Sequence, residues 1–104
     1  LTSSGHIRYT TIGRWWSKDE EIDVVALDEE TKTAYFAECK WSTKKVGTDI
    51  YLDLVRKSHL ADWFNDERTD RFVLFSKSGF TLEMIELALK DNVLLVHKDK
   101  IVEL

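Results

Sequence analysis

The order of the apolar runs, and the lengths of the segments between them, most constrain the fold of this chain. Runs of strand-forming residues cover 7–16, 21–27 and 33–41, and short polar segments at 17–20 and 28–32 separate them. Turns as short as these join neighbouring antiparallel strands, because a parallel pair needs a connection of a dozen or more residues. The first part of the chain therefore predicts an antiparallel meander.

The segment after the meander is long enough to form a crossover helix. A helix is expected over 49–64, with Thr48 as its N-cap and an apolar stripe of Leu52, Val55, Leu60 and Trp63. The run 72–75 is continuously apolar, as is typical of a strand covered on both faces. We expect this strand to lie parallel to the third one.

A second helix over 82–90, started by Thr81, and a strand over 93–96 complete the pattern. The order βββαβαβ predicts an α/β fold with a mixed sheet in sequential strand order, flanked by helices. A length of 104 residues with 43% apolar residues suits one compact domain. We expect this domain over 9–104, with 1–8 as the tail of an upstream segment.

Charged residues interrupt two of these apolar strands. Asp23 lies among Ile, Val, Ala and Leu residues, and Glu38 and Lys40 lie in an aromatic-rich strand. If the intervening turn is centred on Glu30 and Thr31, the residue numbers of any two paired residues add up to 61. Asp23 then lies opposite Glu38, and Lys40 shares the face of Glu38 because side chains alternate along a strand.

Two carboxylates that are about 5 Å apart repel each other. A raised pKa, a neighbouring cation or a bound metal can compensate. Carboxylate oxygens suit Mg²⁺ or Mn²⁺, which can activate water for phosphodiester hydrolysis while a lysine stabilises developing charge. The alternative is a solvated hairpin face with weak ion pairs. A charge in an apolar strand costs free energy unless it is paired or binds a metal, and this favours a metal site over a solvated face.

The segments 21–26 and 36–41 resemble the D…(D/E)xK core of the PD-(D/E)XK nuclease superfamily. Together with 12–16, they are more similar to the nuclease-like domain at the C-terminus of archaeal P-loop ATPases, a domain with no well-assigned function. Segments 76–81 and 93–104 resemble the tail of Mrr-type restriction endonucleases. Archaeal Holliday-junction resolvases are similar over the hairpin. The resemblance implies a restriction-endonuclease-like fold.

This resemblance also implies roles for single residues. Asp23 and Glu38 would be metal ligands, the main-chain carbonyl of Cys39 a third ligand, and Lys40 the catalytic lysine. Ile22 stands where the name-giving proline would be. Many members also carry a glutamate on a preceding helix, and residues 1–8 are too short to supply it.

The activity implied is that of a DNA endonuclease domain dependent on Mg²⁺ or Mn²⁺. The alternative is a noncatalytic nucleic-acid-binding or regulatory domain attached to a P-loop ATPase. The implied partners are branched or duplex DNA and an upstream ATPase domain in the same chain, and a homodimer is left open.

The net charge of −4 argues against a strongly basic body that coats nucleic acid without specificity. Phosphate contacts are instead expected from a local group, which comprises Lys44, Lys45, Arg56 and Lys57. For the last two, solvated helix charges are the alternative.

Cys39 is the single cysteine and cannot form an internal disulfide, and no apolar stretch approaches the about 20 residues that cross a bilayer. These features favour a reducing cytoplasm. We expect Cys39 to be a small buried packing residue. His6, His59 and His97 show no spacing that forms a zinc site with it.

Overall fold

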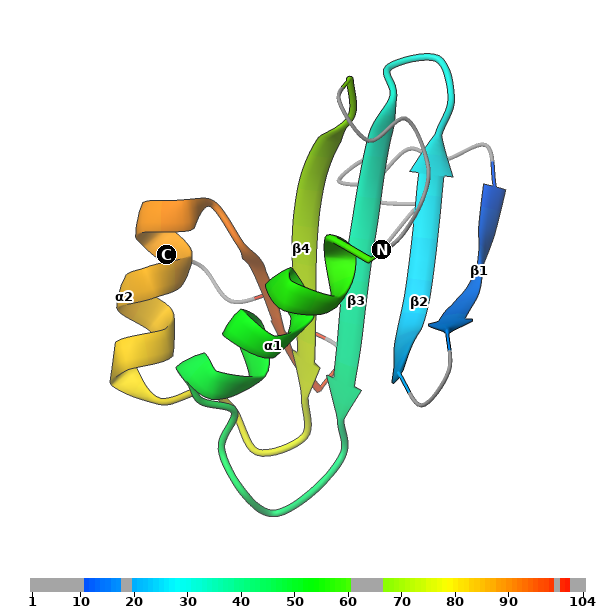
Figure 1. Ribbon diagram of the computed structural model, residues 1–104. Helices are drawn as coiled ribbons and strands as arrows, with labels where there is room; N and C mark the ends of the chain where they lie inside the picture. Colours follow the sequence, from blue (N-terminus) through cyan, green and yellow to red (C-terminus); the bar gives the residue numbers. More distant parts are fainter. Residues whose placement is uncertain (1–10, 18–19, 61–66, 99, 102–104) are drawn as a thin grey trace.

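The computed structural model describes residues 11–17, 20–60, 67–98 and 100–101 as an α/β fold (Figure 1). The strands are β1 (Thr11–Ser17), β2 (Glu20–Asp28), β3 (Thr33–Lys40), β4 (Thr69–Ser76), β5 (Leu94–His97) and β6 (Lys100–Ile101). The helices are α1 (Thr48–Ser58) and α2 (Leu82–Asp91).

These strands form one mixed sheet in the order β1-β2-β3-β4-β5-β6. Pairing is antiparallel from β1 to β3, parallel from β3 to β5, and antiparallel between β5 and β6. The parallel pairs are those whose strands are joined through α1 and α2. The predicted meander, crossover and sequential strand order are confirmed, and the short strand β6 is an addition to them.

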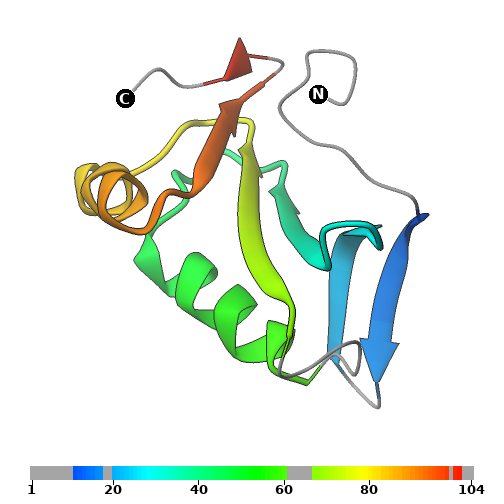
Figure 2. The same cartoon turned by 90° about the horizontal axis from the view of Figure 1, so that it is seen from above.

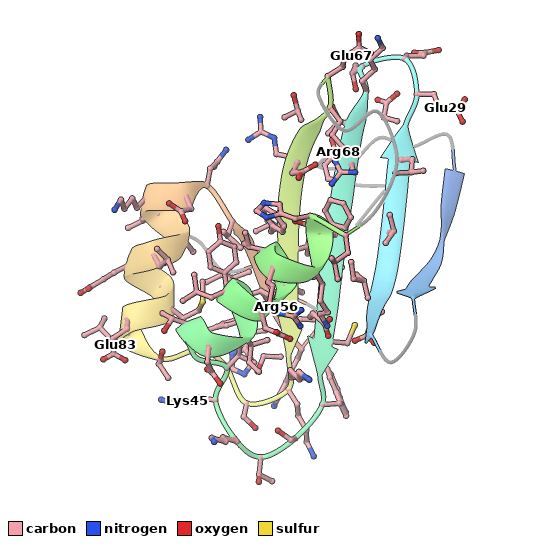
Figure 3. The ribbon with its side chains drawn as sticks, in the orientation of Figure 1. Glu29, Lys45, Arg56, Glu67, Arg68 and Glu83 are labelled. Atoms are coloured by element: carbon pink, nitrogen blue, oxygen red, sulfur yellow. The ribbon has the colours of Figure 1, made fainter. Side chains whose placement is uncertain are left out.

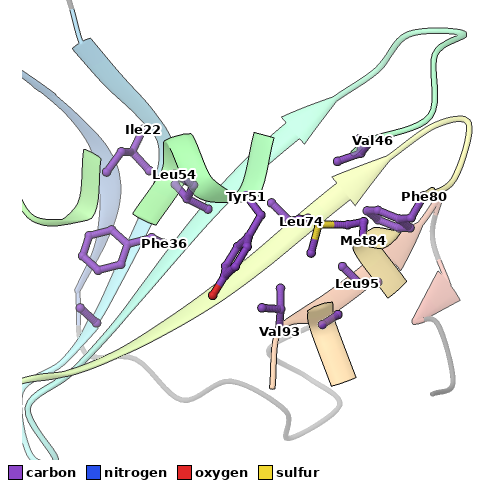
Figure 4. Close-up of a cluster of buried hydrophobic side chains, with 12 residues drawn as sticks. Ile22, Phe36, Val46, Tyr51, Leu54, Leu74, Phe80, Met84, Val93 and Leu95 are labelled. Carbon is purple, nitrogen blue, oxygen red and sulfur yellow. The ribbon is translucent and has the colours of Figure 1, made fainter. Parts of the chain in front are cut away.

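Both helices pack on the same face of the sheet, as Figure 2 shows. The main hydrophobic core lies between them and the sheet (Figure 4). Within it, the Phe72 ring stacks on Phe36 at 5.9 Å and meets Tyr51 edge-on at 5.6 Å between ring centroids. The Tyr51 hydroxyl donates to Asp91 Oδ2 at 3.0 Å. These contacts fix α1 against β3, β4 and the end of α2.

Helix α1 buries a different face from the predicted one. Its buried residues are Tyr51, Leu54 and Ser58. Leu52 and Leu60 are 57% and 52% exposed, so their predicted place in the apolar stripe was wrong, whereas Val55 packs against the core. The aromatic contact of Tyr51 with Phe72 turns the helix by about one residue, which is about 100°. Trp63 lies outside the described residues.

The ends of α1 also differ from the prediction. Gly47 occupies the N-cap position without a side-chain hydrogen bond and Thr48 is the first helical residue, so the predicted Thr48 cap was wrong. The helix ends at Ser58, and 61–64 of the predicted helix lie outside the described residues. Arg68 Nη2 donates to Ser58 O at 2.5 Å and thereby satisfies a carbonyl that the helix end leaves unpaired.

Other element boundaries shift by a few residues. The described part of β1 begins at Thr11, and 7–10 of the predicted strand lie outside the described residues. Strand β4 is longer than the predicted 72–75 because its polar residues 69–71 pair with β3. The predicted start of α2 is confirmed, since Thr81 Oγ1 accepts a hydrogen bond from the Met84 amide at 3.2 Å.

Two substitutions on α1 test which face packs on the sheet. Leu54→Ala should lower the free energy of unfolding by about 2–5 kcal/mol, because it leaves a cavity under a fully buried side chain. Leu52→Ala, on the exposed face, should change it by less than about 0.5 kcal/mol. Urea denaturation measures both, and equal losses would contradict this orientation of α1.

Candidate metal and phosphate site

A β-bulge in β2 sets the position of Asp23. The β1–β2 register shifts between Gly13 and Trp15, which pair with Val25 and Ile22. Two residues of β2, one of them Asp23, therefore lie opposite one residue of β1. Ile22 and Val25 both pack into the main core, so strict alternation of side chains is broken at this point.

The neighbouring β2–β3 ladder has the predicted register. Its pairs run from Val24↔Ala37 to Asp28↔Thr33, and paired positions sum to 61. Beyond the last pair, Asp23 Oδ2 accepts a hydrogen bond from the Cys39 amide at 2.9 Å. The Asp23 carboxylate thus bonds to β3 at the residue next to Glu38 and acts electrostatically on Glu38. The expected direct pair of Asp23 with Glu38 is not among the pairs of the ladder.

Glu38 is buried, with 5% of its surface exposed. Its Oε1 accepts a hydrogen bond from Lys57 Nζ at 2.5 Å, which makes an ion pair between β3 and α1. Burial raises the pKa of Glu38, Lys57 opposes that rise, and the Asp23 carboxylate adds to it. Two of the compensations that the sequence left open therefore act together, and the cation comes from Lys57 of the helix.

The two residues after Glu38 are both exposed. Lys40 ends β3 and makes no ion pair within the described ranges. Cys39 was expected to be buried, and that expectation was wrong, because it lies near the end of β3 on the sheet face that the two helices do not cover. Partial burial and the charges of Asp23 and Glu38 raise the pKa of the Cys39 thiol, which disfavours a reactive thiolate.

The acidic pair fits a hard divalent cation that keeps most of its coordination positions for other ligands. Among the described residues, no group of three or more His, Cys, Asp or Glu side chains forms a metal cage. Asp23 Oδ2 and Glu38 Oε1 already accept hydrogen bonds, and the second oxygen of each carboxylate has no cation partner there. Mg²⁺ is usually held by one or two carboxylates, with water and phosphate completing its shell.

Exposed lysines lie at the same end of the sheet as the acidic pair. Lys40 ends β3, Lys77 follows β4 and Lys98 follows β5, and these three parallel strands end together, as the arrowheads of β3 and β4 show (Figure 1). The Lys77 amide donates to Lys40 O at 3.2 Å and the Lys98 amide to Ser76 O at 2.8 Å. All three side chains are exposed.

The loop before α1 adds Lys44 and Lys45, both exposed, and Figure 3 labels Lys45 below α1. The bridge between Val46 and Phe80 joins this loop to the segment after β4. We call Lys40, Lys44, Lys45, Lys77 and Lys98 the lysine edge. The segments 40–48, 76–81 and 97–98 that carry it contain no Asp or Glu. Positive charge is therefore concentrated there, although the chain has a net charge of −4.

The conformation of the segment after β4 is fixed by Ser76. Its buried Oγ donates to Gly79 O at 2.8 Å and accepts from the Gly79 amide at 3.0 Å. Gly79 has a φ of +93° and lies against the His97 ring, so a side chain there would be strained. This turn positions Lys77 beside Lys40.

Sequence reasoning missed Lys77 and Lys98 as members of this edge. The signal was present, since each lies two positions after the end of a predicted strand. The other two expected phosphate contacts lie differently. Arg56 Nη2 bonds to Asp53 Oδ1 at 2.9 Å, and Lys57 is paired with Glu38. A phosphate role for Arg56 and Lys57 stays a prediction.

Comparisons with known proteins match about half of the chain to sequences without an assigned function. Residues 1–50 match the DUF234 family, described as "Archaea bacterial proteins of unknown function". A segment of 55 residues is 47% identical to an uncharacterized protein of Methanocaldococcus jannaschii. The aligned part covers 51% of this chain and 12% of that relative. No solved structure matches the chain.

The described residues contain no helix that is both long and apolar enough to cross a membrane.

Asp23→Asn tests the repulsion within the acidic pair. The amide oxygen can still accept the Cys39 hydrogen bond, while the negative charge beside Glu38 is removed. At neutral pH the variant should be more stable than the wild type by about 0.5 kcal/mol. Because repulsion requires an ionised Glu38, this gain should disappear as the pH falls below the raised pKa of Glu38.

Urea denaturation at several pH values measures the difference between the two proteins. Glu86→Gln, which removes an exposed acid on α2, controls for the change in net charge. A gain that persists undiminished in acid would show that the two carboxylates do not repel each other in the folded domain.

Proposed function

We propose that this domain hydrolyses phosphodiester bonds of DNA in a reaction that requires Mg²⁺ or Mn²⁺. The observation that carries the proposal is the position of two neighbouring carboxylates, the partly buried Asp23 and the buried Glu38, at the end of the sheet where five exposed lysines lie. A hard cation and a polyanionic backbone need these two features side by side. The resemblance of the hairpin to PD-(D/E)XK nucleases, and the restriction-endonuclease-like fold that it implies, support the same proposal.

Each group would have a distinct task. Asp23 and Glu38 would hold the cation, with the Cys39 carbonyl as a further oxygen ligand. A cation held there would supply Lewis-acid activation of the phosphoryl group and of water. Lys40, two positions after Glu38, would stabilise the negative charge that develops on the phosphoryl group. The other lysines of the lysine edge would bind neighbouring phosphates of the DNA and so position the scissile phosphate at Asp23 and Glu38.

A second candidate is a noncatalytic nucleic-acid-binding or regulatory domain attached to a P-loop ATPase. The ion pair between Glu38 and Lys57 favours it, because this contact compensates the buried carboxylate without any metal. The lysine edge serves binding equally well in both candidates. Cleavage therefore separates the two, and binding does not.

The cleavage test uses plasmid, single-stranded and branched DNA with Mg²⁺, with Mn²⁺ or with EDTA. The wild type should cut only when a metal is present. Asp23→Asn and Glu38→Gln should abolish cutting, because each removes a charged ligand. Lys40→Ala should slow it by about 100-fold or more while leaving metal binding intact.

Lys90→Ala controls for lost charge, since Lys90 is exposed near the end of α2 that lies away from Thr81 and the lysine edge. Binding of DNA without any cutting by the wild type, in either metal, would reject hydrolysis and leave the second candidate.

The phosphate contacts of the lysine edge predict a change in the salt dependence of DNA binding. Lys77→Ala and Lys98→Ala should each lower the slope of log affinity against log salt concentration by about 1, because each removes one phosphate contact. Fluorescence anisotropy of labelled duplex DNA at several salt concentrations measures this slope. Lys90→Ala should leave it unchanged, and unchanged slopes for all three variants would remove the lysine edge from the interface.

A further inference from the structure

Lys57 forms an ion pair with Glu38, one of the two carboxylates that would bind the proposed cation. Its Nζ lies 2.5 Å from Glu38 Oε1, and the two side chains are only 12% and 7% exposed. A divalent cation at Glu38 and the Lys57 ammonium carry like charges, and water screens charges poorly at such a buried position. Both cannot keep close contact with the same carboxylate.

A second acceptor for Lys57 is already within reach. Asp53 lies one turn earlier on α1, and its Oδ2 is 3.8 Å from Lys57 Nζ. Asp53 is about half exposed, and its Oδ1 bonds to Arg56. The ammonium thus lies between a buried carboxylate, which it contacts, and an exposed one, which it nearly contacts. A flexible lysine side chain can exchange the first partner for the second by rotating about its own bonds.

From this arrangement we infer that Lys57 is a displaceable internal counterion, which pairs with Glu38 in the metal-free domain and moves to Asp53 when a divalent cation binds. The inference rests on the metal site of the proposed function and adds a residue that regulates its occupancy. In the metal-free domain the Lys57 ammonium lies against the buried Glu38 carboxylate and compensates it. Every binding event must break that pair, so cation affinity is lower than the two acids alone would give.

Metal titrations of four proteins test this exchange directly. Isothermal titration calorimetry with Mn²⁺ and with Mg²⁺ compares the wild type, Lys57→Met, Asp53→Asn and the double variant. Lys57→Met should bind either cation about tenfold more tightly, because no pair has to break. Asp53→Asn should weaken binding about threefold, because the displaced ammonium loses its alternative partner.

The double variant separates this exchange from simple long-range attraction. Without Lys57, the Asp53→Asn substitution should change cation affinity little, since its effect acts through the lysine. A general loss of negative charge near the site would instead weaken binding equally in both backgrounds. Lys90→Met controls for the change in net charge, and its cation affinity should equal that of the wild type.

Lys57→Arg gives an independent test that keeps the buried positive charge. The guanidinium can hold a carboxylate through two parallel hydrogen bonds, so this variant should bind cations several-fold more weakly than the wild type. Thermal melts and circular dichroism without metal establish that each variant is folded before titration. If Lys57→Met does not fold, Lys57→Arg and Asp53→Asn still decide the question.

The outcomes distinguish this inference from the proposed function. If the wild type binds Mn²⁺ or Mg²⁺ but neither Lys57 variant changes the affinity, Lys57 is a structural partner of Glu38 and only the counterion role is overturned. If no variant binds either cation at millimolar concentration, both the exchange and the metal site fail. Tighter binding by Lys57→Met, together with the coupling to Asp53, supports the inference.

Discussion

The buried ion pair between Glu38 and Lys57 is the contact on which the candidate site depends. It joins β3 to α1. Strand β3 belongs both to the antiparallel meander and to the parallel part of the sheet, and α1 is the crossover helix that follows it. A pair with so little solvent contact costs desolvation free energy, so its net contribution to stability is small while the loss of either partner is expensive. Its main physical effect is to fix the Glu38 carboxylate beside α1 in the interior of the domain.

The bulge in β2 and the lysine edge give this carboxylate its surroundings. Asp23 lies in the bulge of the β1–β2 ladder, and its side chain accepts a hydrogen bond from the Cys39 amide of β3. The parallel strands then bring lysines from three separate segments to the same edge. A negatively charged chain can in this way present a positive surface, because the distribution of charge matters more to a polyanion than the total.

Reasoning from the sequence succeeded where neighbours along the chain decide the structure. The turn centred on Glu30 and Thr31 set the β2–β3 register, and the Thr81 cap set the start of α2. It failed for α1, where Leu52 and Tyr51 offered two adjacent apolar stripes of similar quality. The aromatic contact of Tyr51 with Phe72 selects one of them, and no local pattern contains that contact.

The sequence by itself determined the strand order and the β2–β3 register, because the lengths of turns and connections are local properties of the chain. Only the tertiary structure decided that Lys57, nineteen positions from Glu38, is its partner. It also decided that Lys77 and Lys98 lie beside Lys40. Contacts of this kind depend on how a helix is rotated against a sheet and on which strands end together, and both follow from packing across the whole core.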